Sequence, residues 1–216
     1  MDNLTARRQM VDQQIRTWEV LDPRVLEVLA EVPREAFVPP EYRELAFADA
    51  PIPIGLGQSM LAPKIQGRIL QALSVMASDS VLEVGSGSGY LAACLSLLAL
   101  KTRSIDIHAQ FTAAATANLR TVPNARVEFE TRDAFSSAPL GEYDAIAVTG
   151  SLPVYDARFE RSLRLGGRLF AIVGEAPVMD AILVRRVDNA EWIRESLFET
   201  VIQPLINATA AQKFVF

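Results

Sequence analysis

The stretch VLEVGSGSGY at residues 81–90 decides the fold of this 216-residue chain, because it joins an apolar strand pattern directly to a helical pattern. Gly85, Gly87 and Gly89 let the backbone turn sharply and approach a ligand closely, and the helix that follows presents free N–H groups at its first turn. Ligands of open α/β sheets bind at the carboxyl ends of strands. The stretch therefore predicts a site for a nucleotide-like cofactor.

Two other interpretations of the glycine pattern stay open at this point. Some glycine-rich turns only pack a helix against a strand. A dinucleotide-binding fingerprint would place its third glycine at position 90, where this chain has Tyr90. An NAD-dependent dehydrogenase is therefore the weaker alternative.

Outward from this stretch, short β-rich runs alternate with helical runs toward the C-terminus. Five runs read as strands: SVLEVG (80–85), RSIDI (103–107), RVEFE (126–130), YDAIAV (143–148) and GRLFAIVG (167–174). AILVRRV (181–187) and WIRESLFETVIQPL (192–205) read as two more, joined by the polar turn DNAE. The alternation predicts parallel βαβ units, and hence an α/β fold with a doubly wound, mostly parallel, seven-stranded sheet.

The N-terminal third reads as helices followed by a proline-rich arm. Residues 4–16 have the pattern of a helix whose apolar face is made of Leu4, Met10, Val11 and Ile15. A second helix begins with Asp22 as N-cap and Pro23 in its first turn. Prolines recur between positions 32 and 57, which excludes regular helix there and predicts an extended arm over the rest of the domain. Pro63 starts a further helix, PKIQGRILQALSVM (63–76).

Composition indicates one compact unit. Half of the residues are hydrophobic, which is enough for one sizeable core, and no linker divides the chain. We expect a single domain over residues 1–216. It would comprise N-terminal helices and a covering arm (1–78), a cofactor-binding core (79–175) and C-terminal strands (176–216).

Charge and residue usage narrow the possible partners. The formal net charge of -5 argues against nucleic-acid binding, which needs a basic face. Cys94, the only cysteine, lies in an apolar helical run and reads as core, and His108, the only histidine, reads as an exposed loop residue. No metal site is predicted. No apolar run could span a bilayer and the N-terminus has no signal-peptide core, so we expect a cytoplasmic protein without a membrane partner.

Acidic residues follow two further predicted strands. Asp106 ends RSIDI, where a carboxylate can accept both hydroxyls of a ribose, and Asp133 follows RVEFE, where it can accept from the exocyclic amine of an adenine. Glu83 completes the form E-x-G-x-G-x-G, which resembles class I methyltransferases that use S-adenosylmethionine. The predicted cofactor-binding residues are Glu83, Gly85, Ser86, Gly87, Gly89, Asp106 and Asp133.

A closer resemblance covers nearly the whole chain. MVDQQIR, DPRVLEVLAEVPREAFVP, EYRELAFAD, PIPIGLGQ, VLEVGSGSGYLAA, YDAIAVTG and GGRLF together resemble the protein-L-isoaspartate O-methyltransferase family. The N-terminal pieces are the most specific, because general methyltransferases do not carry them. The resemblance implies a Rossmann-like methyltransferase fold whose N-terminal helices and arm cover the cofactor. It also implies methylation of the α-carboxylate of isoaspartyl residues in damaged proteins, after which a succinimide forms and allows repair.

The stretch GLGQSMLAP (55–63) departs from the family's usual form, G-x-G-Q-T-I-S-x-P. Gly57, Gln58 and Pro63 fix the register of the comparison. By this resemblance Ser59 falls on the threonine position and Leu61 on the serine associated with catalysis. Ser59, with Gln58 beside it, is then the candidate catalytic residue and an imperfect substitute for the missing hydroxyl. Three further departures are Leu56, Ser162 and Ile172.

Three functions remain open on the sequence. The first is an isoaspartyl methyltransferase acting on carboxylates of damaged proteins or peptides, with activity weak or lost because of Leu61. The second is a methyltransferase of the same fold with an unidentified, less polar small acceptor, which Leu56 and Leu61 favour. The third is an S-adenosylmethionine-binding protein without catalysis. A carboxylate is already ionised near pH 7, so the family's serine would orient the acceptor and not deprotonate it.

Overall fold

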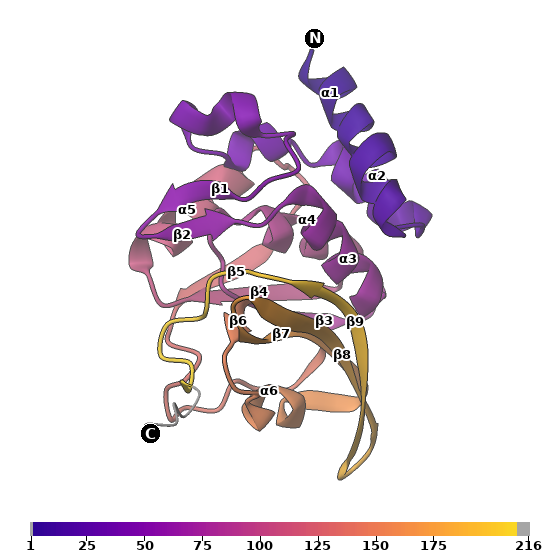
Figure 1. The fold of residues 1–216 in the computed structure, drawn as a ribbon, viewed down its shortest axis with the longest axis vertical. Helices are drawn as coiled ribbons and strands as arrows, with labels where there is room; N and C mark the ends of the chain where they lie inside the picture. The colour runs from indigo at the N-terminus through magenta and orange to yellow at the C-terminus, as the bar shows by residue number, and fades with distance from the viewer. Residues whose placement is uncertain (1, 211–216) are drawn as a thin grey trace.

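A seven-stranded sheet organises residues 2–210, the part of the chain that the computed structural model describes (Figure 1). Its order is β5-β4-β3-β6-β7-β8-β9. The strands are β3 (Ser80–Val84), β4 (Lys101–Asp106), β5 (Val127–Thr131), β6 (Tyr143–Leu152), β7 (Leu163–Glu175), β8 (Val178–Asp188) and β9 (Glu191–Thr200). Strands β3 to β7 pair in parallel, whereas β8 and β9 are antiparallel. The predicted doubly wound, mostly parallel sheet is confirmed; the ends of the predicted domain, residues 1 and 211–216, lie outside the described residues.

Helices cover both faces of this sheet. They are α3 (Pro63–Leu73), α4 (Tyr90–Leu98), α5 (Ala109–Leu119) and α6 (Ala157–Arg161). Successive residues of a strand point to opposite faces, and in β6 Ala145 and Ala147 join one apolar cluster while Ile146 and Val148 join the other. Figure 1 shows α3, α4 and α5 on one side of the sheet and α6 on the other. Cys94 is buried in α4, as predicted.

The strand order reverses next to β3. β4 and β5 extend the sheet on one side of β3, and β6 and β7 extend it on the other. The carboxyl ends of β3 and β6 therefore form the switch point where ligands of such sheets bind. No helix in residues 2–210 is long and apolar enough to cross a membrane.

The N-terminal helices match their prediction except at Leu4. Helix α1 (Asn3–Met10) continues as a π-helical segment (Val11–Ile15), and α2 (Pro23–Glu31) begins at Pro23 with Asp22 as its N-cap. Met10, Val11 and Ile15 are buried, but Leu4 is 51% exposed. The expected shared face is wrong for Leu4, because it lies in the first turn of α1, where residues 2–5 are all exposed. Figure 1 shows this end of α1 projecting from the rest of the fold.

The proline-rich arm is less extended than predicted. It contains two 3-10 helices, Arg34–Phe37 and Pro40–Leu45, so the expected exclusion of regular α-helix holds while the extended course is wrong for these turns. The arm ends in a hairpin of β1 (Ile52–Gly55) and β2 (Gln58–Met60). Leu56 and Gly57, at its tip, have φ of 51° and 71°, which is the left-handed geometry of a tight hairpin turn.

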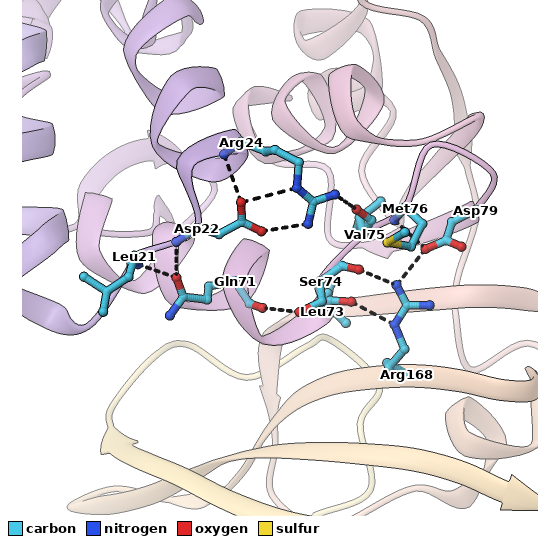
Figure 2. Close-up of polar contacts among 10 residues, drawn as sticks. All are labelled: Leu21, Asp22, Arg24, Gln71, Leu73, Ser74, Val75, Met76, Asp79 and Arg168. Atoms are coloured by element: carbon cyan, nitrogen blue, oxygen red, sulfur yellow. Dashed lines mark hydrogen bonds and ion pairs between the residues drawn. The ribbon is translucent and has the colours of Figure 1, made fainter.

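Arg168 of β7 fixes the end of α3, which stops at Leu73 and not at residue 76 as predicted (Figure 2). Ser74 adopts φ of 43°, a left-handed conformation that ends the helix. The Arg168 guanidinium donates to the carbonyls of Leu73 at 2.8 Å and Ser74 at 3.0 Å, and to Asp79 at 2.6 Å. Carbonyls left unpaired at the helix end are thereby satisfied by the sheet.

The start of α2 is tied to the same helix end (Figure 2). Arg24 pairs with Asp22 at 2.7 Å and donates to the carbonyl of Val75 at 3.0 Å. The amide oxygen of Gln71 accepts from the backbone of Leu21 and Asp22. Through α3, the N-terminal helices are thus anchored to β7.

Candidate functional site

A cavity of about 550 Å³ opens at the carboxyl ends of β3, β4 and β6. This volume lies within the usual range for small-molecule and cofactor sites, about 300 to 1,000 Å³. Three parts of the chain line it: the sheet ends, the hairpin of β1 and β2, and residues 201–206 after β9. Of the predicted site residues, Gly85, Gly87, Asp106, Gln58 and Ser59 line the cavity.

The three glycines have different roles. Gly85 and Gly87 face the cavity with φ of 102° and 49°. A Cβ at Gly85 would collide with the hydroxyl of Thr149, which itself donates to the carbonyls of Val84 and Gly85. Gly89 does not line the cavity; a Cβ there would lie 2.9 Å from the Cα of Ala115 in α5, so this glycine permits close helix packing.

Asp106 lies at the end of β4 with its carboxylate held in place. One oxygen accepts from the backbone N–H of Gly87 at 3.0 Å and the other from that of His108 at 2.9 Å. The side chain lines the cavity although the residue is only 8% exposed. Each carboxylate oxygen has a lone pair left, which is what acceptance from two ribose hydroxyls requires.

Glu83 and Ser86 lie behind the glycine loop and do not line the cavity. The hydroxyl of Ser104 donates to Glu83 and lies 2.7 Å from that of Ser86. Burial raises the pKa of Glu83 to about 8, because the charged carboxylate would lose its water. These residues support the loop from within the sheet. Sequence reasoning missed Ser104, whose only signal was its position in the strand beside β3.

Asp133 also lies off the cavity lining. Its carboxylate accepts from the backbone N–H of Phe135 at 2.8 Å and from the side-chain amide of Asn207 at 2.9 Å. The second contact comes from the segment after β9. No pattern in the sequence predicted that this segment would lie beside Asp133.

His108 was expected to be an exposed loop residue; it does lie in the loop between β4 and α5, but the expected exposure is wrong. The residue precedes α5 as its N-cap, is half-buried and lines the cavity. Its ring meets Phe111 edge to face at 5.4 Å. Packing against the first turn of α5 explains the burial.

The hairpin supplies the wall opposite the glycine loop. Ser59 and Leu61 are half-buried and both line the cavity, whereas Leu56 at the hairpin tip is 52% exposed and lies outside it. The expectation that Leu56 makes the pocket less polar is therefore wrong. Among the described lining residues there is no lysine or arginine; the carboxylates are Asp106 and Glu175.

The segment after β9 forms the third wall. Ser151 donates its N–H to the carbonyl of Gln203 and accepts from the N–H of Leu205, both at 2.9 Å. Leu205 fills the space beside Gly150, where a Cβ would lie 2.7 Å from its Cδ2. The last strand was predicted to extend to residue 205, but β9 ends at Thr200. The chain beyond it returns to β6, where Pro204 forms a bridge with Ser151.

Comparisons with known proteins agree with this geometry. The family model for protein-L-isoaspartate(D-aspartate) O-methyltransferase matches residues 5–210. A protein-L-isoaspartate O-methyltransferase of Rhodopseudomonas palustris is 36% identical over 206 residues, covering 94% of each chain. One of Methanoregula boonei is 39% identical over 201 residues, covering 93% of this chain and 92% of its own.

A solved structure from Plasmodium falciparum, described as a protein-L-isoaspartate O-methyltransferase in complex with S-adenosyl-L-homocysteine, has the same fold. Its TM-score is 0.80 at 18% identity, and the match covers 95% of this chain and 99% of that one. The resemblance read from the sequence, including its S-adenosylmethionine-dependent fold, is confirmed by these matches. The chain belongs to the protein-L-isoaspartate(D-aspartate) O-methyltransferase family.

Proposed function

We propose that this chain binds S-adenosylmethionine in the cavity and that its methyl transfer to isoaspartyl carboxylates is weak or lost. Gly85, Gly87 and Asp106 support the binding step, since the glycines allow close approach and the Asp106 carboxylate has acceptor capacity for a ribose. Ile107 and Phe111 offer apolar lining for an adenine next to Asp106. The cofactor would supply the methyl group, and the chain's residues would bind and orient the acceptor oxygen.

The proposed weakness or loss of methyl transfer rests on Leu61, which lines the same cavity as Gly87 and Asp106. An orienting hydrogen bond to a charged carboxylate is worth about 1.5 to 3 kcal/mol, or roughly a ten- to hundredfold change in rate if it acts in the transition state. Leucine cannot donate that bond and places an apolar wall beside the charge. Ser59 lies in β2, two residues before Leu61, which is about 6.6 Å in an extended chain, so its hydroxyl would reach a different part of the cavity.

A methyltransferase with a less polar acceptor is the second candidate. It is supported by the charges of the lining: an anionic acceptor would meet the carboxylates of Asp106 and Glu175 and no lysine or arginine among the described residues. Apolar side chains such as Ile54, Leu61 and Met179 suit an uncharged acceptor better.

The test compares the natural protein with Leu61→Ser in transfer of labelled methyl from S-adenosylmethionine to an isoaspartyl peptide. We expect the substitution to raise the rate by about tenfold or more. Leu56→Ser is the matched control, because it makes the same change in the same hairpin outside the cavity.

Equal rates for the natural protein and Leu61→Ser, both comparable to those of active relatives, would contradict the loss of activity. If neither protein methylates the isoaspartyl peptide but the natural protein transfers methyl to uncharged small acceptors, the methyltransferase with a less polar acceptor is favoured. Cofactor binding without transfer to any acceptor would favour a binding protein.

A further inference from the structure

Arg34 is a fully buried cation at the junction of the N-terminal arm and the core. Its relative exposure is 0%, and no carboxylate among the described residues forms an ion pair with it. Burying a charge is strongly unfavourable unless hydrogen bonds replace its water. The neighbours of Arg34 must therefore supply that replacement.

Three neutral oxygens do so. The Nε of Arg34 donates to the carbonyl of Ala46 at 2.8 Å, and one terminal nitrogen donates to the carbonyl of Leu61, also at 2.8 Å. The other terminal nitrogen donates to the amide oxygen of Gln66 in α3. The guanidinium is a rigid planar fork, so the three acceptors are held in one fixed arrangement.

Arg34 also contacts the cofactor side of the molecule. Its guanidinium carbon lies 4.9 Å from the ring centroid of Tyr90, the first residue of α4, which directly follows the glycine loop. Phe37 packs edge to face on the same ring at 5.6 Å. One side chain thus touches both the helix that begins at the glycine loop and the backbone of the segment that lines the acceptor side.

We infer that Arg34 is a positioning residue for methyl transfer, which holds Ser59 and Leu61 at a fixed place relative to the glycine loop. This inference rests on the proposed function. The peptide bond is planar, so a fixed carbonyl at Leu61 limits the rotation of that residue and the direction of its side chain. The glycine loop does not depend on the hydrogen bond from Arg34 to Leu61, since the backbone N–H groups of Gly87 and His108 donate to the carboxylate of Asp106.

The experiment uses Arg34→Lys, which keeps the charge but cannot reach all three oxygens. Hydrogen exchange should become about tenfold faster at the amides of residues 59–61, while exchange in α4 and the affinity for S-adenosylmethionine change by less than about threefold. With an isoaspartyl peptide in the Leu61→Ser background, kcat should fall about tenfold at an unchanged cofactor affinity.

Arg68→Lys is the matched control. Arg68 donates to Trp18 and Glu19 and lies 5.0 Å from the ring of Phe198. Like Arg34 it is an arginine over an aromatic ring, with a side chain only 15% exposed, but it forms no hydrogen bond with residues 59–61. Its substitution should leave exchange at those amides unchanged.

Equal acceleration of exchange in residues 59–61 and in α4, or the same pattern from Arg68→Lys, would overturn the inference in favour of a general structural role. Should Arg34→Lys fail to fold, Gln66→Met removes one of the three acceptors and should give the same contrast at about threefold. Absence of cofactor binding in the natural protein would contradict the proposed function. The difference in hydrogen exchange between residues 59–61 and α4 would still decide whether Arg34 positions that segment.

Discussion

The glycine loop after β3 and the hairpin of β1 and β2 line the same cavity, but different contacts hold them. Asp106 and Thr149, from the neighbouring strands β4 and β6, bind the loop, and Ser104 supports it from behind. The hairpin segment is held across the domain by Arg34, and the side chains it offers to the cavity are partly apolar. Because neighbouring strands of the sheet hold the glycine loop, residues of the opposite wall can change without displacing it. Cofactor binding can therefore be kept while the acceptor changes.

The largest effect should come from adding a methyl group at Gly89, where the start of α4 packs closely against α5. Gly89→Ala places a Cβ 2.9 Å from the Ala115 Cα at φ of 86°, and we expect the free energy of unfolding to fall by about 3 kcal/mol or more. Gly166→Ala is the control: its φ is 78° but no heavy atom lies within 4 Å, so strain alone should cost about 1 to 2 kcal/mol. Chemical denaturation measures both, and equal losses would show that α4 and α5 can separate.

Removing the carboxylate at the end of β4 should weaken cofactor binding next. Asp106→Ala should reduce the affinity for S-adenosylmethionine by about a hundredfold in calorimetric titration, because hydrogen bonds to a charged group are lost. Asp133→Ala should change it by less than about threefold, since Asp133 lies off the cavity lining. The reverse order would mean that Asp133 turns toward an adenine when the cofactor binds.

The buried carboxyl of Glu83 should make stability depend on pH. Its pKa is about 8 in the folded chain, well above the usual carboxyl range, so near neutral pH it is protonated when folded and ionised when unfolded. The folded state then binds more protons, and its contribution to stability is full below about pH 4.5 and is lost as pH rises to about 8.

Between pH 6 and pH 7 this contribution should fall by roughly 1 kcal/mol. Glu83→Gln removes the titration, and denaturation curves at the two pH values should differ less for the variant by that amount. An identical difference in both proteins would show that Glu83 is ionised in the fold.

The smallest effect should come from the acceptor side. Ser59→Ala should change the affinity for S-adenosylmethionine by less than about twofold, because Ser59 lies on the hairpin wall and, among the described residues, the glycine loop is held by Asp106 instead. Any methyl transfer should fall while binding stays constant. A large loss of affinity would contradict the separation of the two walls.

The place of Gly85, Gly87 and Asp106 at one cavity could be predicted from the sequence because their signals are local. Three glycines after an apolar strand and Asp106 at the end of the next one are read within a few residues, and parallel strands bring those ends together. Glu83, Gly89 and Asp133 have residue types that suit a cofactor site, but they lie off the cavity lining and make packing and support contacts that the local pattern does not show, so their part in cofactor binding stays a prediction.

The acceptor side depends on contacts between distant parts of the chain. Arg34 and Leu61 are 27 residues apart, and Ser151 and Leu205 are more distant still. Nothing in the pattern around Leu56 shows that the hairpin turn directs it away from the cavity, and nothing around His108 shows that Phe111 will cover it. Such contacts are fixed only when the whole domain packs.

The wall formed by residues 201–206 has a consequence for biosynthesis. The ribosome makes the glycine loop, Asp106 and the hairpin before this wall, and Gly150 has no Leu205 beside it until residues 201–206 have been added. A nascent chain can therefore carry the cavity-lining residues of the sheet while its cavity is still open on one side, and the site is completed only when residues 201–206 have been made and folded back.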